Sequence, residues 1–240
     1  MRALTPHRTP ASHRILALAL ALSSAAQAGD RPRVVGVTFS PGGAQVLAVT
    51  SWVADGSGFP SAHLSLLSTA SGQQLHEASA QDRQGRLNEA QVRAGLLRSN
   101  AAQLQIAGVA GRPNSQPRFA LPPRVQSPAW TEALAAGQSR TTPVFLWSKK
   151  VPITLSVRRS NAPCAYPGLL PPGEGPATFT LKVNTQVLRT PSTPAVPCAA
   201  RYALERVDLS GNRVLITVRA YGPGFEGPNA TPVFIAATLR

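Results

Sequence analysis

Apolar residues alternate with polar or small ones along much of this chain, the period of a half-buried β-strand. Near the beginning, residues 34–39 and 45–50 form two such stretches on either side of Ser40-Pro-Gly-Gly43. Proline presets the φ angle of a turn and glycine permits positive φ, so the segment predicts a strand, a tight turn and a strand. Residues 63–68 alternate in the same way and extend the meander to three strands or more.

The same alternation returns in the second half of the chain. Ser210-Gly-Asn212 separates two of the stretches and is a short hairpin signal. The predicted fold class is therefore mainly β, with antiparallel sheets that are sandwich-like or partial-propeller-like. The stretches are residues 144–147, 151–157, 178–183, 202–209, 213–220 and 233–239.

Between residues 87 and 107 the period changes to that of a helix. Asn88 with Gln91 three residues later is the arrangement of a capping box, and Gly108 is a typical helix end. Ser99-Asn100 is a point where the helix could split in two. We expect one inserted α-helix that packs on the core through one face, formed by Leu87, Ala90, Ala94, Leu97, Ala101 and Leu104.

The segment 111–143 is rich in proline, with prolines at positions 113, 117, 122, 123 and 128. Proline has no amide hydrogen to donate to a strand ladder, so the stretch is predicted to be a connector rather than sheet. We expect residues 29–240 to form a single exported domain, with a possible subdivision at this connector.

The first 28 residues have the layout of a secretory signal peptide. Arg2, Arg8 and Arg14 precede the apolar run 15–22, and small residues follow up to Ala28. This layout predicts cleavage after Ala28. The run is too short to span the ~30 Å of a bilayer core, and no later stretch reaches the necessary ~18 apolar residues. The expected location is secreted or periplasmic, without a transmembrane segment.

Export also bears on the two cysteines, Cys164 and Cys198. Disulfides form and persist in oxidising compartments, so the two residues are predicted to pair.

The chain is basic, with 24 Lys and Arg residues against 10 Asp and Glu residues and a formal net charge of +14. Such a charge favours contact with an anionic envelope polymer. Lys149-Lys150 and Arg158-Arg159 are the dense basic pairs and form the candidate polyanion patch. No basic run reaches the length typical of nucleic-acid-binding segments, so nucleic acid is not the expected partner.

The search for catalytic motifs is negative. The sequence contains no G-x-S-x-G, P-loop, H-E-x-x-H, C-x-x-C or EF-hand pattern. We therefore assign no catalytic residue and no metal ligand, and expect a non-enzymatic envelope or extracellular module.

Two glycine-rich loops, 55–60 and 222–228, each place one carboxylate beside an aromatic residue and a proline. In a structural interpretation, aspartate caps the turn and glycine supplies the unusual dihedrals. In a functional interpretation, both loops meet at one rim of the sheet and bind Ca²⁺ through oxygen ligands, or bind a glycan with aromatic rings as stacking faces. The candidate ligand-binding residues are Trp52, Asp55, Ser57, Tyr221 and Glu226.

An alternative makes Asp55 and Glu226 the acid and base of a glycosidase-like hydrolase, which needs a carboxylate separation of about 5–10 Å. A basic surface that binds polyanions is a further alternative.

Two segments carry a resemblance to a known family. The first is 36–43, which leads to 55–60 and the strand 64–67, and the second is 221–228. Together they resemble the DUF2259 family of predicted secreted bacterial proteins, whose function is unassigned. The chain differs from the family pattern at Gly42 or Gly43, at residues 50–54 and at Ser61. The first hairpin is also similar to a single blade of TolB-type β-propellers.

Overall fold

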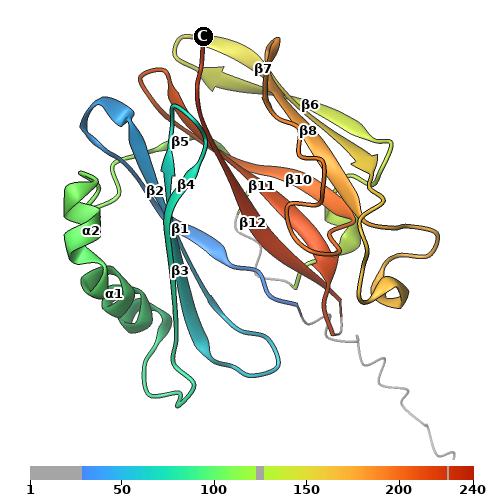
Figure 1. Ribbon diagram of the computed structural model, residues 1–240, viewed down its shortest axis with the longest axis horizontal. Coiled ribbons are helices and arrows are strands. Elements are labelled where there is room, and N and C mark those ends of the chain that lie inside the picture. The colour runs from blue at the N-terminus through green and yellow to red at the C-terminus, as the bar shows by residue number, and fades with distance from the viewer. Residues whose placement is uncertain (1–28, 123–126, 226) are drawn as a thin grey trace, which may run out of the picture.

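The computed structural model describes residues 29–122, 127–225 and 227–240. Within these ranges the chain forms three antiparallel sheets of four strands each, with a helical segment on one side (Figure 1). The predicted mainly β fold class is confirmed. The expected signal peptide (residues 1–28), residues 123–126 of the expected connector and Glu226 lie outside the described residues.

The first sheet is an antiparallel meander with the strand order β1-β2-β3-β4. The turn after β1 is a short 3-10 segment, η1 (Pro41–Gly43), in which Gly42 and Gly43 both have positive φ, as the sequence predicted. The strands are β1 (Arg33–Phe39), β2 (Gln45–Val53), β3 (Pro60–Ser68) and β4 (Gln74–Gln81).

The central sheet has the order β12-β11-β10-β5. The predicted hairpin at residues 210–212 joins β10 to β11, where Ser210 pairs with Arg213. The strands are β5 (Pro117–Ala120), β10 (Arg201–Ser210), β11 (Arg213–Pro223) and β12 (Pro228–Thr238). Every residue from position 214 to position 222 is buried, because β11 is covered on both faces.

The outer sheet has the order β6-β7-β8-β9. Its strands are β6 (Ser139–Leu146), β7 (Lys149–Arg159), β8 (Ala177–Val183) and β9 (Gln186–Arg189). Two short 3-10 segments lie in the loops before β6 and β8, namely η2 (Trp130–Glu132) and η3 (Pro167–Leu169).

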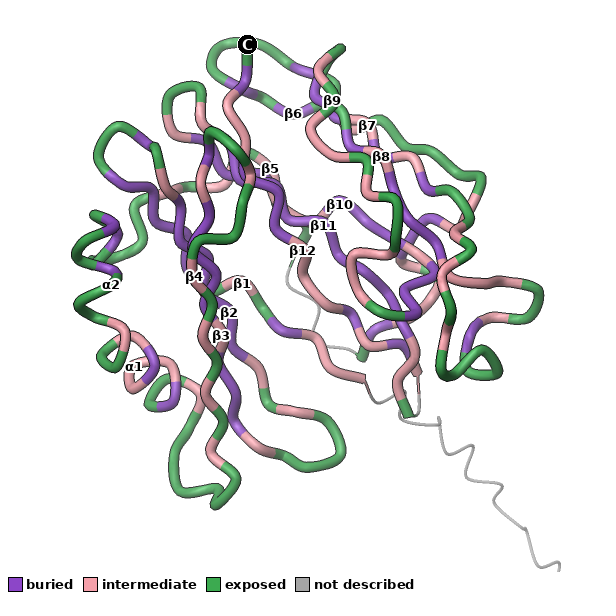
Figure 2. The backbone as a smooth tube through the Cα atoms, viewed as in Figure 1, coloured by how far each residue is buried: buried purple, intermediate pink, exposed green. Residues whose placement is uncertain are grey.

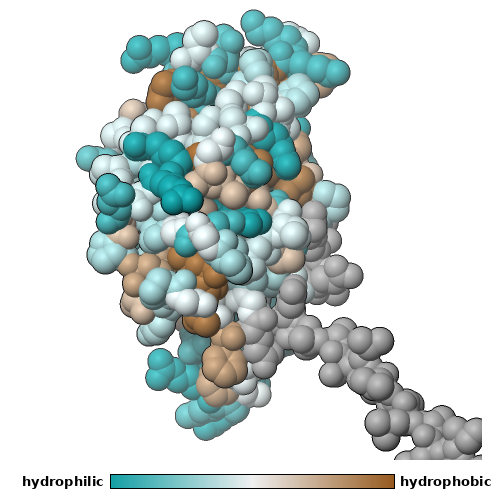
Figure 3. All heavy atoms as spheres, turned by 90° about the vertical axis from the view of Figure 1, so that its right-hand side faces the viewer, coloured by the Kyte–Doolittle hydropathy of each residue, from teal (hydrophilic) through white to brown (hydrophobic). Residues whose placement is uncertain are grey.

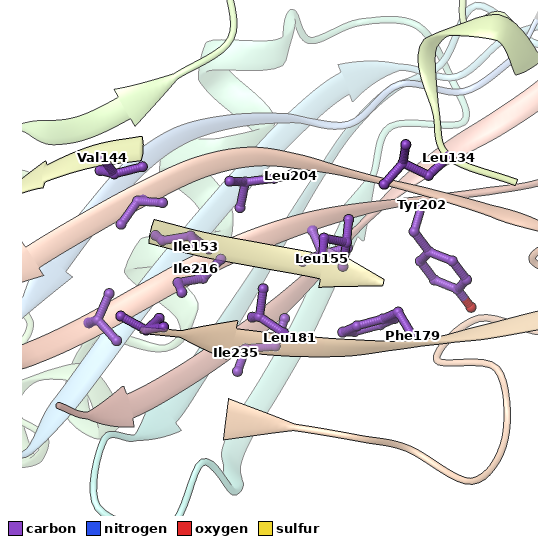
Figure 4. Close-up of a cluster of buried hydrophobic side chains, with 14 of the residues drawn as sticks. Leu134, Val144, Ile153, Leu155, Phe179, Leu181, Tyr202, Leu204, Ile216 and Ile235 are labelled. Carbon is purple, nitrogen blue, oxygen red and sulfur yellow. The ribbon is translucent and has the colours of Figure 1, made fainter. Parts of the chain in front are cut away.

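The sheets stack in layers, and each interface has its own apolar core (Figure 2). The largest core lies between the outer and central sheets, where side chains of β7 and β8 point toward those of β10, β11 and β12 (Figure 4). The rings of Phe179 and Tyr202 lie there with centroids 4.9 Å apart. A second core joins the central sheet to the first sheet, and a third joins the first sheet to the helices.

The helical segment begins where the sequence predicted. α1 (Glu89–Ser99) starts after Asn88, and the capping box of Asn88 and Gln91 is present. The helix does split near Ser99-Asn100, and α2 (Ala101–Ile106) follows. The predicted buried face was mostly wrong: Leu87 and Ala90 are exposed, and the residues that pack on the sheet are Val92, Leu96 and Leu104, with Leu97 partly buried.

The assignment of residues 111–143 to a connector without sheet was also wrong. β5 begins at Pro117, and β6 contains Pro143. Both are edge strands, and an edge strand tolerates proline because one side of it needs no ladder hydrogen bonds.

The predicted disulfide is confirmed. Cys164 and Cys198 are bonded, with a sequence separation of 34. The bond ties the loop before β8 to the segment that leads into β10. In the part of the chain that the structure describes, no helix combines the length and apolarity needed to cross a membrane.

Candidate functional site

The candidate site is a polar cleft between the first sheet and the central sheet, which we call the Trp52 cleft. Its position follows from the alternation of β2 and β3. Val46 and Ala48 on β2 and Leu67 on β3 belong to the apolar core against the central sheet. Side chains two and four positions further along a strand share its face. The same face therefore continues into Thr50 and Trp52 on β2 and into Ser65 and His63 on β3.

The Trp52 cleft has a volume of about 490 Å³. Its walls come from all three sheets: β2, β3 and β4 on one side, β12 on the other, and the end of β9 with residues 195–196 between them. Asp30, three residues before β1, also lines it. Besides Trp52, the residues that bring chemistry to it are Asp30, His63, Glu77, Arg189 and Asn229.

His63 is held by two hydroxyl groups. Its Nδ1 lies 2.9 Å from Ser79 Oγ, and its Nε2 lies 3.0 Å from Ser65 Oγ. Glu77 Oε1 is 3.6 Å from the same Nε2. Burial lowers the pKa of His63 below its ordinary value of 6.5, and the negative charge of Glu77 opposes this shift. The imidazole is therefore neutral at pH 7, and each of its nitrogens already has a partner.

Two other donors in the cleft have no partner. The indole Nε1 of Trp52 and the guanidinium Nε of Arg189 are buried and form no hydrogen bond within the described residues. Buried N–H groups are nearly always paired, with protein, water or a ligand. The two strands that carry these donors, β2 and β9, belong to the first sheet and the outer sheet.

Asp30 connects the predicted Asp55 loop to the start of β12. Its carboxylate accepts a hydrogen bond of 2.6 Å from the amide of Asp55, and its own amide donates to Asn229 Oδ1 at 2.9 Å. Asn229 Nδ2 in turn donates to the carbonyl of Pro223. The 55–60 loop and the base of the 222–228 loop are thus linked beside the cleft. Ser57 accepts from the amide of Phe59 at 3.3 Å, and both Asp55 and Ser57 are exposed.

The structure does not bring the two predicted stacking rings together. Trp52 lines the Trp52 cleft, whereas Tyr221 lines a different cavity and is only 2% exposed. The hydroxyl of Tyr221 donates to Glu132 Oε2 at 2.9 Å. Burial, and after it the charge of Glu132, raises the pKa of Tyr221 to about 12. The neighbouring Glu226 lies outside the described residues, so its side chain is not placed.

The four residues of the predicted polyanion patch fall at the two ends of one strand. Lys149 and Lys150 begin β7 and Arg158 and Arg159 end it, roughly 30 Å away at the usual rise of a strand. All four are exposed. Figure 3, which shows the side of the molecule that carries the outer sheet, has a mostly hydrophilic surface with small separate apolar areas. The basic residues therefore form two separate pairs on this side.

His63, Asp30 and Arg189 were missed by the sequence reasoning. The position of His63 could have been inferred from the sequence. His63, Ser65 and Leu67 share one face of a predicted strand, and the residues of that face become polar toward the 55–60 loop. Asp30 and Arg189 come to the cleft from distant parts of the chain. The local sequence pattern around each residue cannot predict that they lie close together. The described residues contain no group of three or more His, Cys, Asp or Glu side chains that could hold a metal ion.

Comparison with known proteins assigns the chain to a family. A family model described as a predicted secreted protein, DUF2259, matches residues 48–238, which include Trp52, His63, Glu77 and Arg189. No curated protein and no solved structure matches the chain.

Proposed function

Because the chain belongs to the DUF2259 family of predicted secreted proteins, we propose that it is a non-enzymatic binding module outside the cytoplasm that holds a glycan in the Trp52 cleft. The observation that carries the proposal is Trp52, which lines the cleft and whose buried indole N–H has no acceptor among the described residues. A sugar hydroxyl would supply that acceptor, and the indole ring offers an apolar face to the sugar ring.

The other polar groups of the cleft suit a ligand that both donates and accepts hydrogen bonds. Arg189 Nε is a second donor without a partner among the described residues, and the Glu77 carboxylate, 3.6 Å from His63 Nε2, is 62% exposed and can accept further hydrogen bonds. Sugars carry hydroxyl groups that do both. The volume of about 490 Å³ lies within the range of small-ligand sites and is sufficient for one or two sugar units.

The glycosidase-like alternative receives no support from this cleft. A general acid requires a carboxyl group whose pKa is raised by an apolar, buried environment. Glu77 and Asp55 are both exposed, and Asp30 already accepts the amide hydrogen of Asp55. Ca²⁺ binding at the rim stays a prediction that depends on Glu226.

The test uses tryptophan fluorescence. The chain has three tryptophans, so Trp130→Phe/Trp147→Phe leaves Trp52 as the only one. This variant is titrated with a panel of soluble neutral and acidic oligosaccharides. We expect at least one member to change the emission of Trp52 in a saturable way. If no oligosaccharide changes it, the proposal is wrong.

Calorimetry with the identified oligosaccharide then separates the ring from its N–H group. Trp52→Phe keeps an aromatic ring and removes one hydrogen bond, for which we expect an affinity loss of roughly 2- to 10-fold. Trp52→Ala should abolish measurable binding. Trp147→Phe is the matched control, because Trp147 lies in the β6–β7 hairpin and donates to Gly211 outside the cleft. Equal affinity of Trp52→Ala and the wild type would refute the site.

A further inference from the structure

A second cavity of about 490 Å³ lies on the opposite side of the same two sheets, and the proposed function does not use it. It is enclosed by the edge strand β1, the first turns of α1, strands β10 and β11, and Leu121 and Pro122 after β5. We call it the arginine cavity, because five arginines line it: Arg31, Arg33, Arg93, Arg206 and Arg219.

Each of the three acidic residues that line this cavity already has an arginine partner. Arg31 binds Glu132 at 2.6 Å, and Arg33 binds both oxygens of Glu89 at 2.8 and 2.7 Å. The buried guanidinium of Arg219 binds Glu205 and also donates to the carbonyls of Pro32 and Ala230. These three pairs fix the walls of the cavity and cancel their own charge.

The net charge of the arginine cavity depends on the two remaining arginines, Arg206 and Arg93. Arg206 is neutralised by Asp208, with N–O distances of 2.6 and 2.8 Å. Arg93 on α1 forms no hydrogen bond or ion pair with any residue that the structure describes. Among the described residues, four of the five guanidinium groups that line the cavity are thus paired with a carboxylate, three of them in the lining and the fourth Asp208. The positive charge of Arg93 is the one left for a ligand.

Two buried polar atoms in the walls of the cavity add hydrogen-bonding requirements to this charge. Arg31 Nε is a donor and Glu205 Oε2 is an acceptor, and neither has a partner among the described residues. A matching ligand must accept a hydrogen bond at one point and donate one at another. The remaining lining includes Val34, Val35 and Leu121, so part of the wall is apolar.

We propose that the arginine cavity binds a small hydroxylated carboxylate, of the class of sugar acids and hydroxy acids. The carboxylate matches the single surplus charge and the planar, forked geometry of Arg93, and a hydroxyl group donates to Glu205 Oε2. A phosphate monoester carries nearly two negative charges at neutral pH and would exceed the charge that this cavity leaves unmatched. This site is independent of the Trp52 cleft.

The probes are D-glucuronate and D-gluconate, with D-glucose as the uncharged counterpart and glucose 6-phosphate as the doubly charged one. Isothermal titration calorimetry should show saturable binding of at least one of the two acids. Glucose and the phosphate should bind at least about tenfold more weakly. Binding of neither acid, or equal binding of glucose, would overturn the proposal. Tighter binding of the phosphate would replace the carboxylate with a phosphate ligand and would also overturn it.

The residue test uses Arg93→Gln, because Arg93 forms no hydrogen bond or ion pair with the described residues and glutamine keeps part of its side-chain length. We expect at least a tenfold loss of affinity for the acid, since a charge-assisted hydrogen bond is lost. Arg98→Gln is the matched control on the same helix, because Arg98 is exposed and does not line the cavity. Unchanged affinity in Arg93→Gln would refute the site.

Trp52→Ala separates this inference from the proposed function. If the acid binds in the arginine cavity, this variant retains the wild-type affinity for glucuronate or gluconate. If the variant loses that affinity, the acid occupies the Trp52 cleft and the inference fails, while the glycan proposal is unaffected.

Discussion

At the scale of single residues, the protonation of His63 in the Trp52 cleft affects the stability of the fold. Its side chain lies between Ser65 and Ser79 on neighbouring strands, and burial lowers its pKa below 6.5. A residue with a lowered pKa binds protons more tightly in the unfolded chain than in the folded one. Its contribution to stability is therefore complete above pH 6.5 and is lost as the pH falls through the folded-state pKa.

We expect the free energy of unfolding to decrease between pH 7 and pH 5, and His63→Gln to reduce this decrease. Urea unfolding of both proteins at half-unit pH intervals measures it. Glutamine retains hydrogen-bonding atoms near Ser65 and Ser79 and does not titrate, which makes it the suitable control side chain. Two parallel stability profiles would show that the proton bound by His63 does not matter for folding.

The residue scale also shows which parts of the site the sequence could reveal. Trp52 was predicted because an aromatic residue precedes a glycine-rich loop, which is a local signal. Tyr221 was expected to stack on a ligand, but the central position of β11 buries it against Glu132. Whether a ring faces a ligand or a neighbouring sheet depends on what covers the strand, and alternation along one strand does not contain that information.

At the scale of elements, the disulfide has a larger expected effect than any single strand contact. It closes a 34-residue separation that contains β8 and β9. In the chain-entropy model such a closure stabilises the fold by roughly 3–4 kcal/mol through the unfolded state. We expect Cys164→Ser/Cys198→Ser to lose about this much in urea unfolding.

A reductant provides the control for this prediction. It should lower the stability of the wild type to that of the double variant and leave the variant unchanged. Wild-type stability in the double variant under oxidising conditions would contradict the assigned role of the bond.

Elements whose signals are local were predictable, and those that depend on docking were not. The start of α1 follows from Asn88 and Gln91, which bond to each other within one turn. The buried helix face was mostly missed because small and apolar residues occur on more than one side, and contact with the first sheet selects Val92 and Leu96. Strands β4, β5 and β9 are edge strands with weak apolar alternation, so pairing with a neighbour defines them.

At the scale of the whole molecule, the stacking of the first sheet on the central sheet determines where both cavities lie. The first and central sheets share an apolar core, and the two cavities lie on opposite sides of it. Residues 214–222 of β11 are all buried, including Thr217 and Arg219, because both faces of the strand are covered. Which sheet covers which face is set by residues from both halves of the chain, such as Val37 and Leu215, and no local pattern pairs them.

Export is also a property of the whole molecule, and membership in a family of predicted secreted proteins agrees with it. We predict that the chain is cleaved after Ala28, so that the mature protein begins at Gly29. Asp30 would then lie next to the new N-terminus, and its amide is held by Asn229 beside the Trp52 cleft. Cleavage would therefore create a new N-terminus next to a residue that already lines the Trp52 cleft.

Intact mass spectrometry of protein from the periplasm and the culture medium of an expressing bacterium tests the cleavage. We expect the mass of residues 29–240 with one disulfide. Ala26→Arg/Ala28→Arg should block processing, because signal peptidase sites require small residues at these two positions, whereas Ala26→Ser/Ala28→Ser should be processed normally. Recovery of wild-type protein that retains Met1 and has free thiols at Cys164 and Cys198 would refute export, because a reducing cytosol would then be its compartment.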